Sequence, residues 1–538
     1  MRPTVSLARR WQPEALLTLA QDCDDMAREL SDLVAAAVAN AQRSSDFWMG
    51  AAAEAARQRA HRIDAQADAV ARDLVLASAA ARDGAAQLAA ARNTALADVD
   101  RAEQDGFLVS DDGSVTAGPD PVPLLVLLAG GREAVAQDLL GSTAAAVSAR
   151  ICQALARVGS ADADAAHDIA SALDAGGQER SPAAAATVPA GAWPVQAVDV
   201  VDAWPMMSQD RIAGQIAAMS AEQRERLIAE FPRQVGNTDG VPWQMRTAAN
   251  RLNIAAAVLA ETGADPGSRS RVAFYRSLLG EIDDPAGGLR IPRQILAFDP
   301  DRASLVELNG DLTTARGVAV LVPGVNTTIE ASAANTDTAR RFVSATGGDT
   351  AVITYLGGPF PQVHDPVAVL SEAADPRYAR DMAPRLVAFT EDVDRQVPDG
   401  VPVTVIGHSY GGSIVGTAET LGLTSDNTVF LAAAGAGVGV DDAGDWHNRN
   451  PGVIRYSMTA PGDFIELVQG IPGGPHGVDP DEMPGVIALP TGTYDDGSAV
   501  AGWDAHSGML NRPGDSWRTI LAIISGDSVA VRRVAAPG

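Results

Sequence analysis

The sequence predicts an α/β fold with a mostly parallel sheet of about eight strands, preceded by an all-helical region. Two observations carry this prediction. After residue 290, short apolar runs rich in Val and Ile recur at fairly even intervals, as the strands of a buried parallel sheet do. Before that point the chain is rich in alanine, and its apolar residues recur every three or four positions, which is the helical period. With 538 residues the chain is too long for one ordinary core, so we expect several domains.

Residues 12–105 predict two long helices joined by a tight turn, which is an antiparallel helical hairpin. Apolar residues between positions 16 and 37 follow one another at spacings of three and four, and the stretch 63–81 continues this rhythm. The bend between them reads SSDFWMGAAAEAA (44–56), with Trp48-Met49-Gly50 at its centre.

Trp-x-Gly at the bend of a helical hairpin resembles the WxG proteins, which are substrates and modules of type VII secretion. This resemblance implies a partner, either another helical hairpin or the secretion machinery, and export without a signal peptide. The export signal of that family is Tyr-x-x-x-Asp/Glu beyond the second helix. Here Val99 stands where the tyrosine would be, and Glu103 holds the acidic place. The alternative is that Trp48 only packs the bend of an ordinary hairpin.

The segments that follow suggest the domain boundaries. DGFLVSDDGSVTAG (105–118) predicts a short β-hairpin or turn through its Asp-Gly pair. Residues 130–175 predict two more alanine-rich helices, and residues 176–194 have the composition of a linker. We therefore expect a WxG-like hairpin at 1–118, additional helices and the linker at 119–194, a helical segment that packs on or caps the next domain at 195–290, and the α/β domain at 291–538.

Charge and hydropathy exclude several functions. The chain carries 41 Lys and Arg against 68 Asp and Glu, a formal net charge of −27, which repels phosphate backbones, so we expect no nucleic-acid partner. The N-terminus lacks the apolar stretch of a secretory signal. The most apolar run, PVPLLVLLAG (121–130), is far shorter than a membrane span, so we expect no transmembrane segment. We expect the protein to be cytoplasmic or, in preference, secreted by the signal-peptide-independent type VII route.

Eight strands are expected in the second half of the chain. The pair RQILAFD (293–299) and SLVELNG (304–310) brackets a turn at Asp299-Pro300-Asp301 and predicts a hairpin. Six further strands are GVAVLVPG (317–324), AVITYLGG (351–358), PVTVIGHS (402–409), TVFLAAAG (428–435), VIRYSMTA (453–460) and GVIALP (485–490). Helical stretches or loops separate them, which favours parallel pairing.

The stretch VTVIGHSYGGSIVG (403–416) carries the strongest motif. Gly407 and Gly411 flank Ser409 in the pattern G-x-S-x-G, after an apolar strand and before an apolar helix. This is the nucleophile elbow of the α/β hydrolases, in which a strained turn lifts the serine hydroxyl out of the sheet. Glycines are needed there because other side chains would collide with the strand and the helix. The sequence therefore predicts an α/β-hydrolase fold with Ser409 as nucleophile.

A serine nucleophile needs a base and an acid, and in this fold they follow in the order Ser, Asp/Glu, His. Asp463 lies in the loop after a later strand, and His506 lies near the C-terminus in WDAHSGML. We predict these two residues as the acid and the base. Asp463 has the alternative role of capping the helix that follows it. The other candidates for acid and base are Asp441, Asp442, Asp445, Asp479, His447 and His476.

An oxyanion hole requires two backbone N–H groups. One is expected from Tyr410, directly after the nucleophile, and the other from Val325 or Asn326 in the loop after the strand VAVLVPG. Substrate-pocket candidates are His408, Tyr355, Phe360, His364 and His476. A metal held by His476 and Asp479 is the less favoured interpretation, and we expect no metal and no cofactor.

Six motifs in order resemble an actinobacterial α/β-hydrolase family of unknown function that often follows WxG-type helical domains. They are GNTDGVPWQMRTAANR, LVPGVNTT, YLGG, GHSYGGSIVG, APGDFIEL and DAHSGML, and they span residues 208–515. The resemblance implies Ser409, Asp463 and His506 as the catalytic triad, and it implies no substrate.

The function expected from these observations is that of a serine hydrolase of the esterase or lipase type, acting on an ester or lipid-like small molecule through an acyl-enzyme. The helical hairpin would serve secretion or partner binding. The alternative is a type VII secretion-associated interaction protein, or a secreted toxin, whose hydrolase domain is secondary or inactive.

Overall fold

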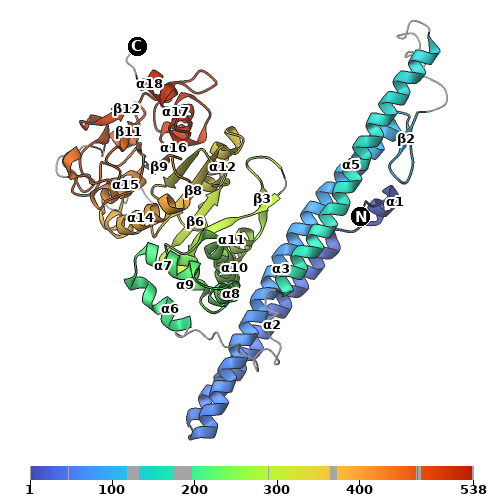
Figure 1. Cartoon of the computed structure of the whole chain (residues 1–538), viewed down its shortest axis with the longest axis horizontal. Coiled ribbons are helices and arrows are strands. Elements are labelled where there is room, and N and C mark those ends of the chain that lie inside the picture. Colours follow the sequence, from blue (N-terminus) through green and yellow to red (C-terminus); the bar gives the residue numbers. More distant parts are fainter. Residues whose placement is uncertain are drawn as a thin grey trace. The chain divides into compact units, whose positions relative to one another are not determined.

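The computed structural model describes residues 2–46, 48–117, 132–174, 197–288, 290–363, 372–467, 469 and 474–535. The chain forms two compact units, drawn in Figure 1: residues 1–192 with 258–280, and residues 193–257 with 281–538. Residues 258–280 thus group with the N-terminal helices rather than with the rest of the expected segment 195–290. The expected linker 176–194 and the apolar run 121–130 lie outside the described residues, and the four-part division stays a prediction.

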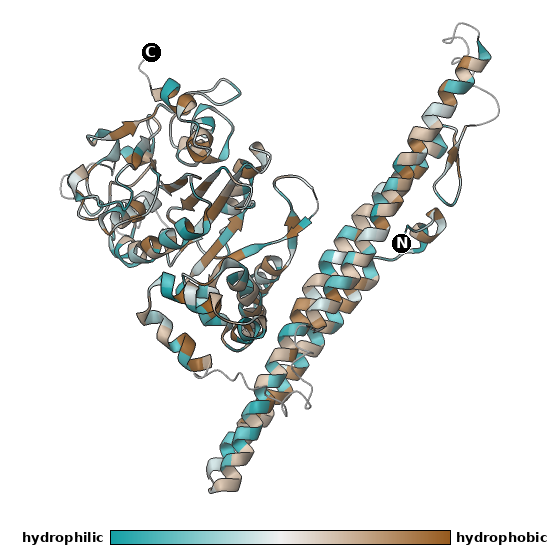
Figure 2. Cartoon of the chain, in the orientation of Figure 1, coloured by the Kyte–Doolittle hydropathy of each residue, from teal (hydrophilic) through white to brown (hydrophobic). Residues whose placement is uncertain are grey.

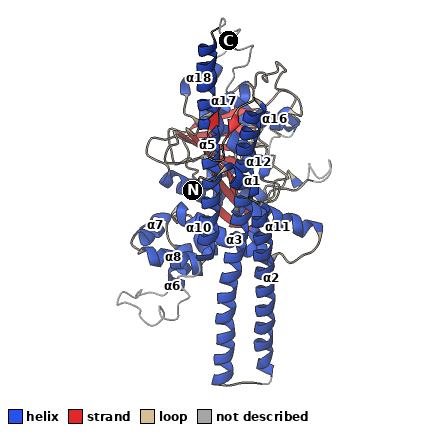
Figure 3. Cartoon of the chain, turned by 90° about the vertical axis from the view of Figure 1, so that its right-hand side faces the viewer, coloured by secondary structure: helices blue, strands red, loops and turns tan. Residues whose placement is uncertain are grey.

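The first unit is built from helices. They are α1 (Val5–Arg10), α2 (Glu14–Arg43), η1 (Ser44–Asp46), α3 (Ala51–Gln104), α5 (Glu133–Asp174) and α11 (Pro266–Leu279). Helices α2 and α3 form the expected hairpin and run side by side in Figure 3. The short strands β1 (Leu108–Val109) and β2 (Val115–Thr116) pair antiparallel, as the Asp-Gly stretch predicted.

Residues 133–174 form one helix, α5, and not the two helices that we expected. The segment contains no proline, and its two glycines, Gly141 and Gly159, each cost a helix only about 1 kcal/mol. Helix α5 packs on α3, where Gly84 permits the contact because a Cβ there would lie 2.5 Å from the Cβ of Ala165. Among the described residues α5 is also the one helix long and apolar enough to cross a membrane, a property that core helices of proteins outside membranes share.

A buried carboxylate ties three of these helices together. Asp24 on α2 is 3% exposed and forms ion pairs with Arg82 of α3 at 2.5 Å and with Arg276 of α11 at 2.8 Å. Two guanidinium groups offset the cost of burying one carboxylate. This pairing explains why α11 belongs to the helical unit.

The second unit is an α/β domain around an eight-stranded sheet, and it confirms the predicted fold class. The sheet order is β12-β11-β10-β9-β7-β8-β6-β5. The pairs β5–β6 and β6–β8 are antiparallel and all the others are parallel. The strands are β5 (Gln294–Asp299), β6 (Ser304–Asn309), β7 (Gly317–Val322), β8 (Thr350–Leu356), β9 (Val403–His408), β10 (Asn427–Leu431), β11 (Ile454–Met458) and β12 (Val486–Ala488).

Each expected strand is present, because the central strands are apolar on both faces. Every residue of β7 and β8 is buried, and Figure 2 shows the strands of the sheet as mainly hydrophobic. The other elements of this unit are α6 (Ala197–Ala203), α7 (Gln209–Ala217), α8 (Ala221–Glu230), α9 (Pro232–Asn237), α10 (Trp243–Ala260), the strand pair β3 (Glu281–Asp283) and β4 (Arg290–Pro292), α12 (Ala333–Ala345), α14 (Arg377–Gln396), α15 (Tyr410–Thr420), α16 (Ala505–Asn511), α17 (Asp515–Ile524) and α18 (Ser528–Ala535).

The motif GNTDGVPWQMRTAANR covers the edge strand β5. The side-chain amide of Asn237 donates to the carbonyl of Phe298 at 3.1 Å and accepts from its N–H at 2.9 Å. Arg246 Nε donates to the Leu296 carbonyl at 2.8 Å, and Asn250 donates to another carbonyl of the strand. These side chains satisfy backbone groups that an exposed edge would offer to other chains. This motif therefore has a structural role in the α/β unit.

Candidate active site

Ser409 lies in the strained turn between β9 and α15. Its φ is 57° and its ψ is −123°, a conformation that costs a non-glycine residue about 1–3 kcal/mol. The backbone around it maintains this turn: the Ser409 N–H donates to the Leu431 carbonyl, and the Ser409 carbonyl accepts from the N–H groups of Gly412 and Ala434, each at 3.0 Å. A Cβ on Gly411 would collide with the Val322 carbonyl. Tertiary contacts thus impose the strain predicted from the motif.

His506 and Asp463 lie together, although 43 positions separate them. The ring Nδ1 of His506 is 3.0 Å from each carboxylate oxygen of Asp463, and Asp463 is only 2% exposed. An ionised carboxylate only accepts hydrogen bonds, so Nδ1 carries the proton and Nε2 keeps a free lone pair. Asp463 also accepts the N–H of Ile465 at 3.0 Å. The Asp463 side chain therefore has two roles: it caps the 3₁₀ turn η6 (Phe464–Leu467), and it orients the ring of His506.

The structure does not join all three predicted residues. Among the described residues, no hydrogen bond links Ser409 Oγ with the ring of His506. Ser409 has its own surroundings: it lines a cavity and is 5% exposed. The acid and the base are thus hydrogen-bonded to each other, whereas no such bond ties the serine to the base; the His506 ring lies 4.4 Å from that of Phe464, which lines the same cavity.

We expected His408 to line the substrate pocket, but its side chain contacts and supports His506 instead. Its Nε2 lies 2.7 Å from the backbone carbonyl of His506, and the two rings are 4.9 Å apart. A carbonyl can only accept, so His408 Nε2 donates. Burial, followed by the charge of His506, lowers the pKa of His408 to about 4, so the ring is neutral near pH 7. Its side chain holds the loop that carries the base.

One hydrogen bond decides between Val325 and Asn326 as the candidate for the second N–H donor of the oxyanion hole. The N–H of Asn326 donates to the Pro361 carbonyl at 2.9 Å, so it is engaged within the chain. Asn326 has a φ of 60°, and its side-chain oxygen accepts the N–H of Val363 at 2.6 Å. Asn326 therefore shapes the loop, and Val325 remains as the donor beside Tyr410. The N–H of Tyr410 belongs to the first turn of α15, where it has no partner within the helix.

A cavity of about 330 Å³ opens at Ser409. Its lining residues come from the segments that follow five strands of the sheet, β7 to β11: Val325, Asn326, Val363, Ala373, Ala374, Ser409, Tyr410, Ala434, Phe464, Ile465, Gly474, Pro475, His476 and Gly477. We did not predict from the sequence that the alanines and Phe464 line this cavity. Phe464 was detectable in principle, because it directly follows Asp463 in the motif APGDFIEL.

Of the expected pocket residues, His476 lines this cavity, whereas Tyr355 and Phe360, like His408, do not. Tyr355 lines a separate cavity of about 300 Å³ together with Asp239 and Arg246. Phe360 is 2% exposed and is not among the lining residues. Tyr355 belongs to β8, where side chains alternate between the two faces of the sheet, and the sequence does not indicate which face meets the cavity. His364 lies outside the described residues.

His476 closes the cavity wall with both ring nitrogens engaged. Nε2 lies 2.7 Å from the Ala373 carbonyl and Nδ1 lies 2.8 Å from Ser413 Oγ. Nε2 therefore donates, and Nδ1 accepts the serine hydroxyl in the neutral ring. Burial lowers the pKa of His476, which favours this neutral form.

The rival acids and the rival histidine shape turns elsewhere. Asp442 and Asp479 accept backbone N–H groups at the starts of short 3₁₀ turns, and Asp445 accepts the N–H groups of Asp441 and Asp442. The backbone N–H of His447 donates to the Glu419 carbonyl, and its side chain is exposed. Within the described residues, no group of three or more His, Cys, Asp or Glu is arranged to hold a metal ion.

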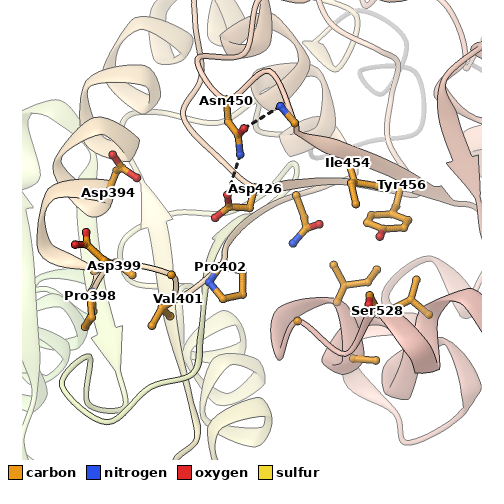
Figure 4. A pocket seen from close by; sticks show the side chains of 18 residues that line it. Asp394, Pro398, Asp399, Val401, Pro402, Asp426, Asn450, Ile454, Tyr456 and Ser528 are labelled. Atoms are coloured by element: carbon orange, nitrogen blue, oxygen red, sulfur yellow. Dashed lines mark hydrogen bonds between the residues drawn. The ribbon is translucent and has the colours of Figure 1, made fainter.

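A larger cavity lies at the opposite edge of the sheet. It measures about 600 Å³, and its lining includes Asp426, Asn427 and Ile454, at the amino ends of β10 and β11. Figure 4 shows Asn450 hydrogen-bonded to Asp426 on its wall. The nucleophile elbow is at the carboxyl end of β9, so this larger cavity has no part of the predicted site.

Comparison with known proteins agrees with the fold. Residues 299–471 match the family model described as "Alpha/beta hydrolase". With the eight-stranded sheet, this match supports an α/β-hydrolase fold for the second unit.

Two curated relatives come from Mycobacterium tuberculosis: "Uncharacterized protein Rv2079" of strain H37Rv and "Uncharacterized protein MT2140" of strain CDC 1551. Each is 29% identical over 265 residues, which cover 40% of this chain and 38% of the relative. The chain thus spans about two fifths of the length of the curated relatives it matches.

Solved structures with similarity include a dienelactone hydrolase-like promiscuous phosphotriesterase, P91, from metagenomic libraries (16% identity, TM-score 0.26, 46% of this chain and 96% of that chain). Another is a hyperthermophilic esterase from the archaeon Pyrobaculum calidifontis (11% identity, TM-score 0.23, 59% of this chain and 99% of that chain).

Proposed function

We propose that the protein is a serine hydrolase that cleaves carboxylic esters through a triad of Ser409, His506 and Asp463. The observation that carries the proposal is the pairing of His506 Nδ1 with buried Asp463 at 3.0 Å. This pairing leaves Nε2 of His506 as the basic atom. The same unit contains Ser409, which has a strained backbone and lines a cavity. A serine hydroxyl, a base and an orienting acid are the parts that acyl transfer requires.

In the proposed reaction, Ser409 Oγ attacks the acyl carbon and its proton passes to His506 Nε2. The N–H groups of Val325 and Tyr410 bind the oxyanion of the tetrahedral intermediate. When the intermediate collapses, the imidazolium returns the proton to the leaving alcohol and an acyl-serine remains. Water, deprotonated by the same nitrogen, then releases the acid and restores Ser409. The contact between serine and histidine forms when substrate binds, as catalytic hydrogen bonds often tighten only in the complex.

A fluorophosphonate probe tests this mechanism directly, because it labels only an activated serine. We expect the wild-type chain to be labelled, and Ser409→Ala to remain unlabelled. Ser528→Ala, which removes a hydroxyl from the wall of the cavity at the opposite edge, is the matched control and should be labelled like the wild type. Folded wild-type protein that resists the probe, or labelling that survives Ser409→Ala, would refute the mechanism.

A second proposal concerns the helical hairpin, which we infer to be a module for partner binding and signal-peptide-independent secretion. What supports it is the bend, where Trp48 is 43% exposed and Met49 is 86% exposed. An exposed tryptophan and methionine are better explained by a binding surface than by packing of the bend. The test is the amount of protein in the culture medium of a mycobacterial host, with and without a functional type VII apparatus, for wild type and Trp48→Ala. Equal export in all four cases would refute it.

A further inference from the structure

The cavity at Ser409 differs in chemistry from the other cavities of the same unit. The cavity at the amino edge is lined by Asp394, Asp399 and Asp426, and the one beside Tyr355 by charged residues of both signs. Among the described residues that line the Ser409 cavity, none has a charged side chain. Most of its wall is aliphatic or aromatic, with Phe464, Ile465 and several alanines.

Several polar groups on this wall are already paired. The Tyr410 hydroxyl donates to the Asp375 carbonyl. Both ring nitrogens of His476 are engaged, and the side-chain oxygen of Asn326 accepts the Val363 N–H. A charged or amide-bearing group inside the cavity would lose its water without a compensating ion pair, which is unfavourable for a polar group and more so for a charge.

The same hydrogen bonds define the size of the cavity. His476 joins residue Ala373 to helix α15 through Ser413, and Tyr410 joins Asp375 to the start of that helix. Hydrogen bonds thereby hold the wall segment 373–375 at both of its ends. A volume of about 330 Å³ is roughly twice that of a cavity that takes up benzene, so it has room for about a dozen carbon atoms.

We propose that this cavity is an acyl pocket that selects uncharged acyl chains of about six to twelve carbons and rejects acyl groups with a terminal charge. The proposal rests on the ester hydrolase mechanism above and adds its substrate class. Each methylene that enters the pocket leaves water, which favours the transition state by about fourfold in kcat/KM. This gain continues until the pocket is full.

The test is a series of p-nitrophenyl esters from acetate to palmitate with the full-length protein. We expect kcat/KM to rise by about three- to fourfold per methylene to an optimum at about eight to ten carbons, and then to fall. The p-nitrophenyl monoester of adipic acid, which matches the hexanoate ester in chain length but ends in a carboxylate, should be at least about 100-fold poorer than the hexanoate.

Two variants sharpen the test. Ala374→Phe fills the pocket and should shift the optimum to shorter chains, whereas Ile465→Ala enlarges it and should shift the optimum to longer chains. Ala522→Phe, a matched change on the wall of the larger cavity at the opposite edge, should leave the profile unchanged. Thermal melting of each variant shows that it is folded.

The outcomes separate the two proposals. Labelling of Ser409 by the fluorophosphonate together with a flat profile, an acetate optimum or ready hydrolysis of the adipate would overturn the acyl pocket alone. An unlabelled Ser409 would overturn the hydrolase mechanism on which it rests.

Discussion

The two edges of the eight-stranded sheet differ in strain and in hydrogen bonding. At the carboxyl edge, Ser409 has a φ of 57°, and the proton on Nδ1 of His506 leaves its Nε2 free. At the amino edge, both oxygens of Asp426 are satisfied, by Asn450 Nδ2 and by the Val403 N–H, each at 2.8 Å. The cavity at the relaxed edge is nonetheless the larger, about 600 Å³ against about 330 Å³.

This difference shows that volume does not identify a reactive site. At the amino edge, hydrogen bonds satisfy both oxygens of Asp426, and the cavity lies where strands β10 and β11 begin. At the carboxyl edge, the strained backbone of Ser409 lowers the stability of the folded chain, and Nε2 of His506 has no hydrogen-bond partner among the described residues. Substitutions matched between the two edges therefore measure how far reactivity is confined to the smaller cavity.

The largest contrast is expected for the two serines. Ser409→Ala removes the nucleophile and should lower kcat for p-nitrophenyl octanoate by about 10⁴- to 10⁶-fold. Ser528→Ala at the amino edge should stay within about twofold of wild type, because Ser528 touches no reacting group. Steady-state hydrolysis measures both. Comparable losses in the two variants would mean that the edges do not differ in function.

The acids give the next contrast. Asp463→Asn reverses the hydrogen bond to His506 Nδ1 and favours the wrong tautomer, so kcat should fall by about 10³- to 10⁴-fold with little change in melting temperature. Asp426→Asn weakens the amino edge and should lower the free energy of unfolding by about 1–3 kcal/mol while kcat stays unchanged. Urea unfolding and kinetics on the same samples provide the check. A large loss of kcat in Asp426→Asn would contradict the comparison.

Glycine substitutions probe the close packing at the nucleophile. A Cβ on Gly324 would lie 2.7 Å from Ser409 Cβ and 3.0 Å from its Oγ. Gly324→Ala must therefore displace either Ser409 or the loop after β7 that carries Val325 and Asn326. We expect kcat to fall by about 10- to 100-fold, since small displacements at the reacting atoms have effects of this size. At the amino edge, Gly452→Ala meets only the side-chain oxygen of Asn450 at 3.3 Å, and activity should be unchanged. Full activity in Gly324→Ala would show that the loop does not act with Ser409.

The last expected effect falls on stability and not on catalysis: it is the pH dependence of unfolding that His408 contributes. Its folded pKa of about 4 lies below the unfolded value of about 6.5, so the unfolded chain binds more protons between these values. The free energy of unfolding should therefore fall by up to about 3 kcal/mol as the pH drops from 6.5 to 4. His408→Gln keeps the donor without titrating and should show a shallower fall in urea titrations. The exposed variant His447→Gln should keep the wild-type slope, and equal slopes for all three proteins would contradict the role given to His408.

Features coded by neighbouring residues were predictable. The eight strands follow from continuous apolar runs, and the elbow follows from Gly407, Ser409 and Gly411, which lie within five positions. The single helix over 133–174 was missed because the break that we expected has only two isolated glycines, Gly141 and Gly159, to support it. The pairing of Asp463 with His506 agrees with the expected chain order of the fold, which restricts the choice even though the sequence separation is large.

Local pattern alone thus accounts for the sheet, the helical hairpin and the strained serine, because the period of apolar residues and the sterics of glycine act over a few positions. The choice of Val325 over Asn326, the support that His408 gives to His506 and the exclusion of Tyr355 from the pocket depend on contacts between loops far apart in the chain. So do the alanines that set the size of the cavity. Side-chain direction and loop packing are settled only when the strands are in register, and one hydrogen bond, such as that from Asn326 to Pro361, then decides which atom remains free.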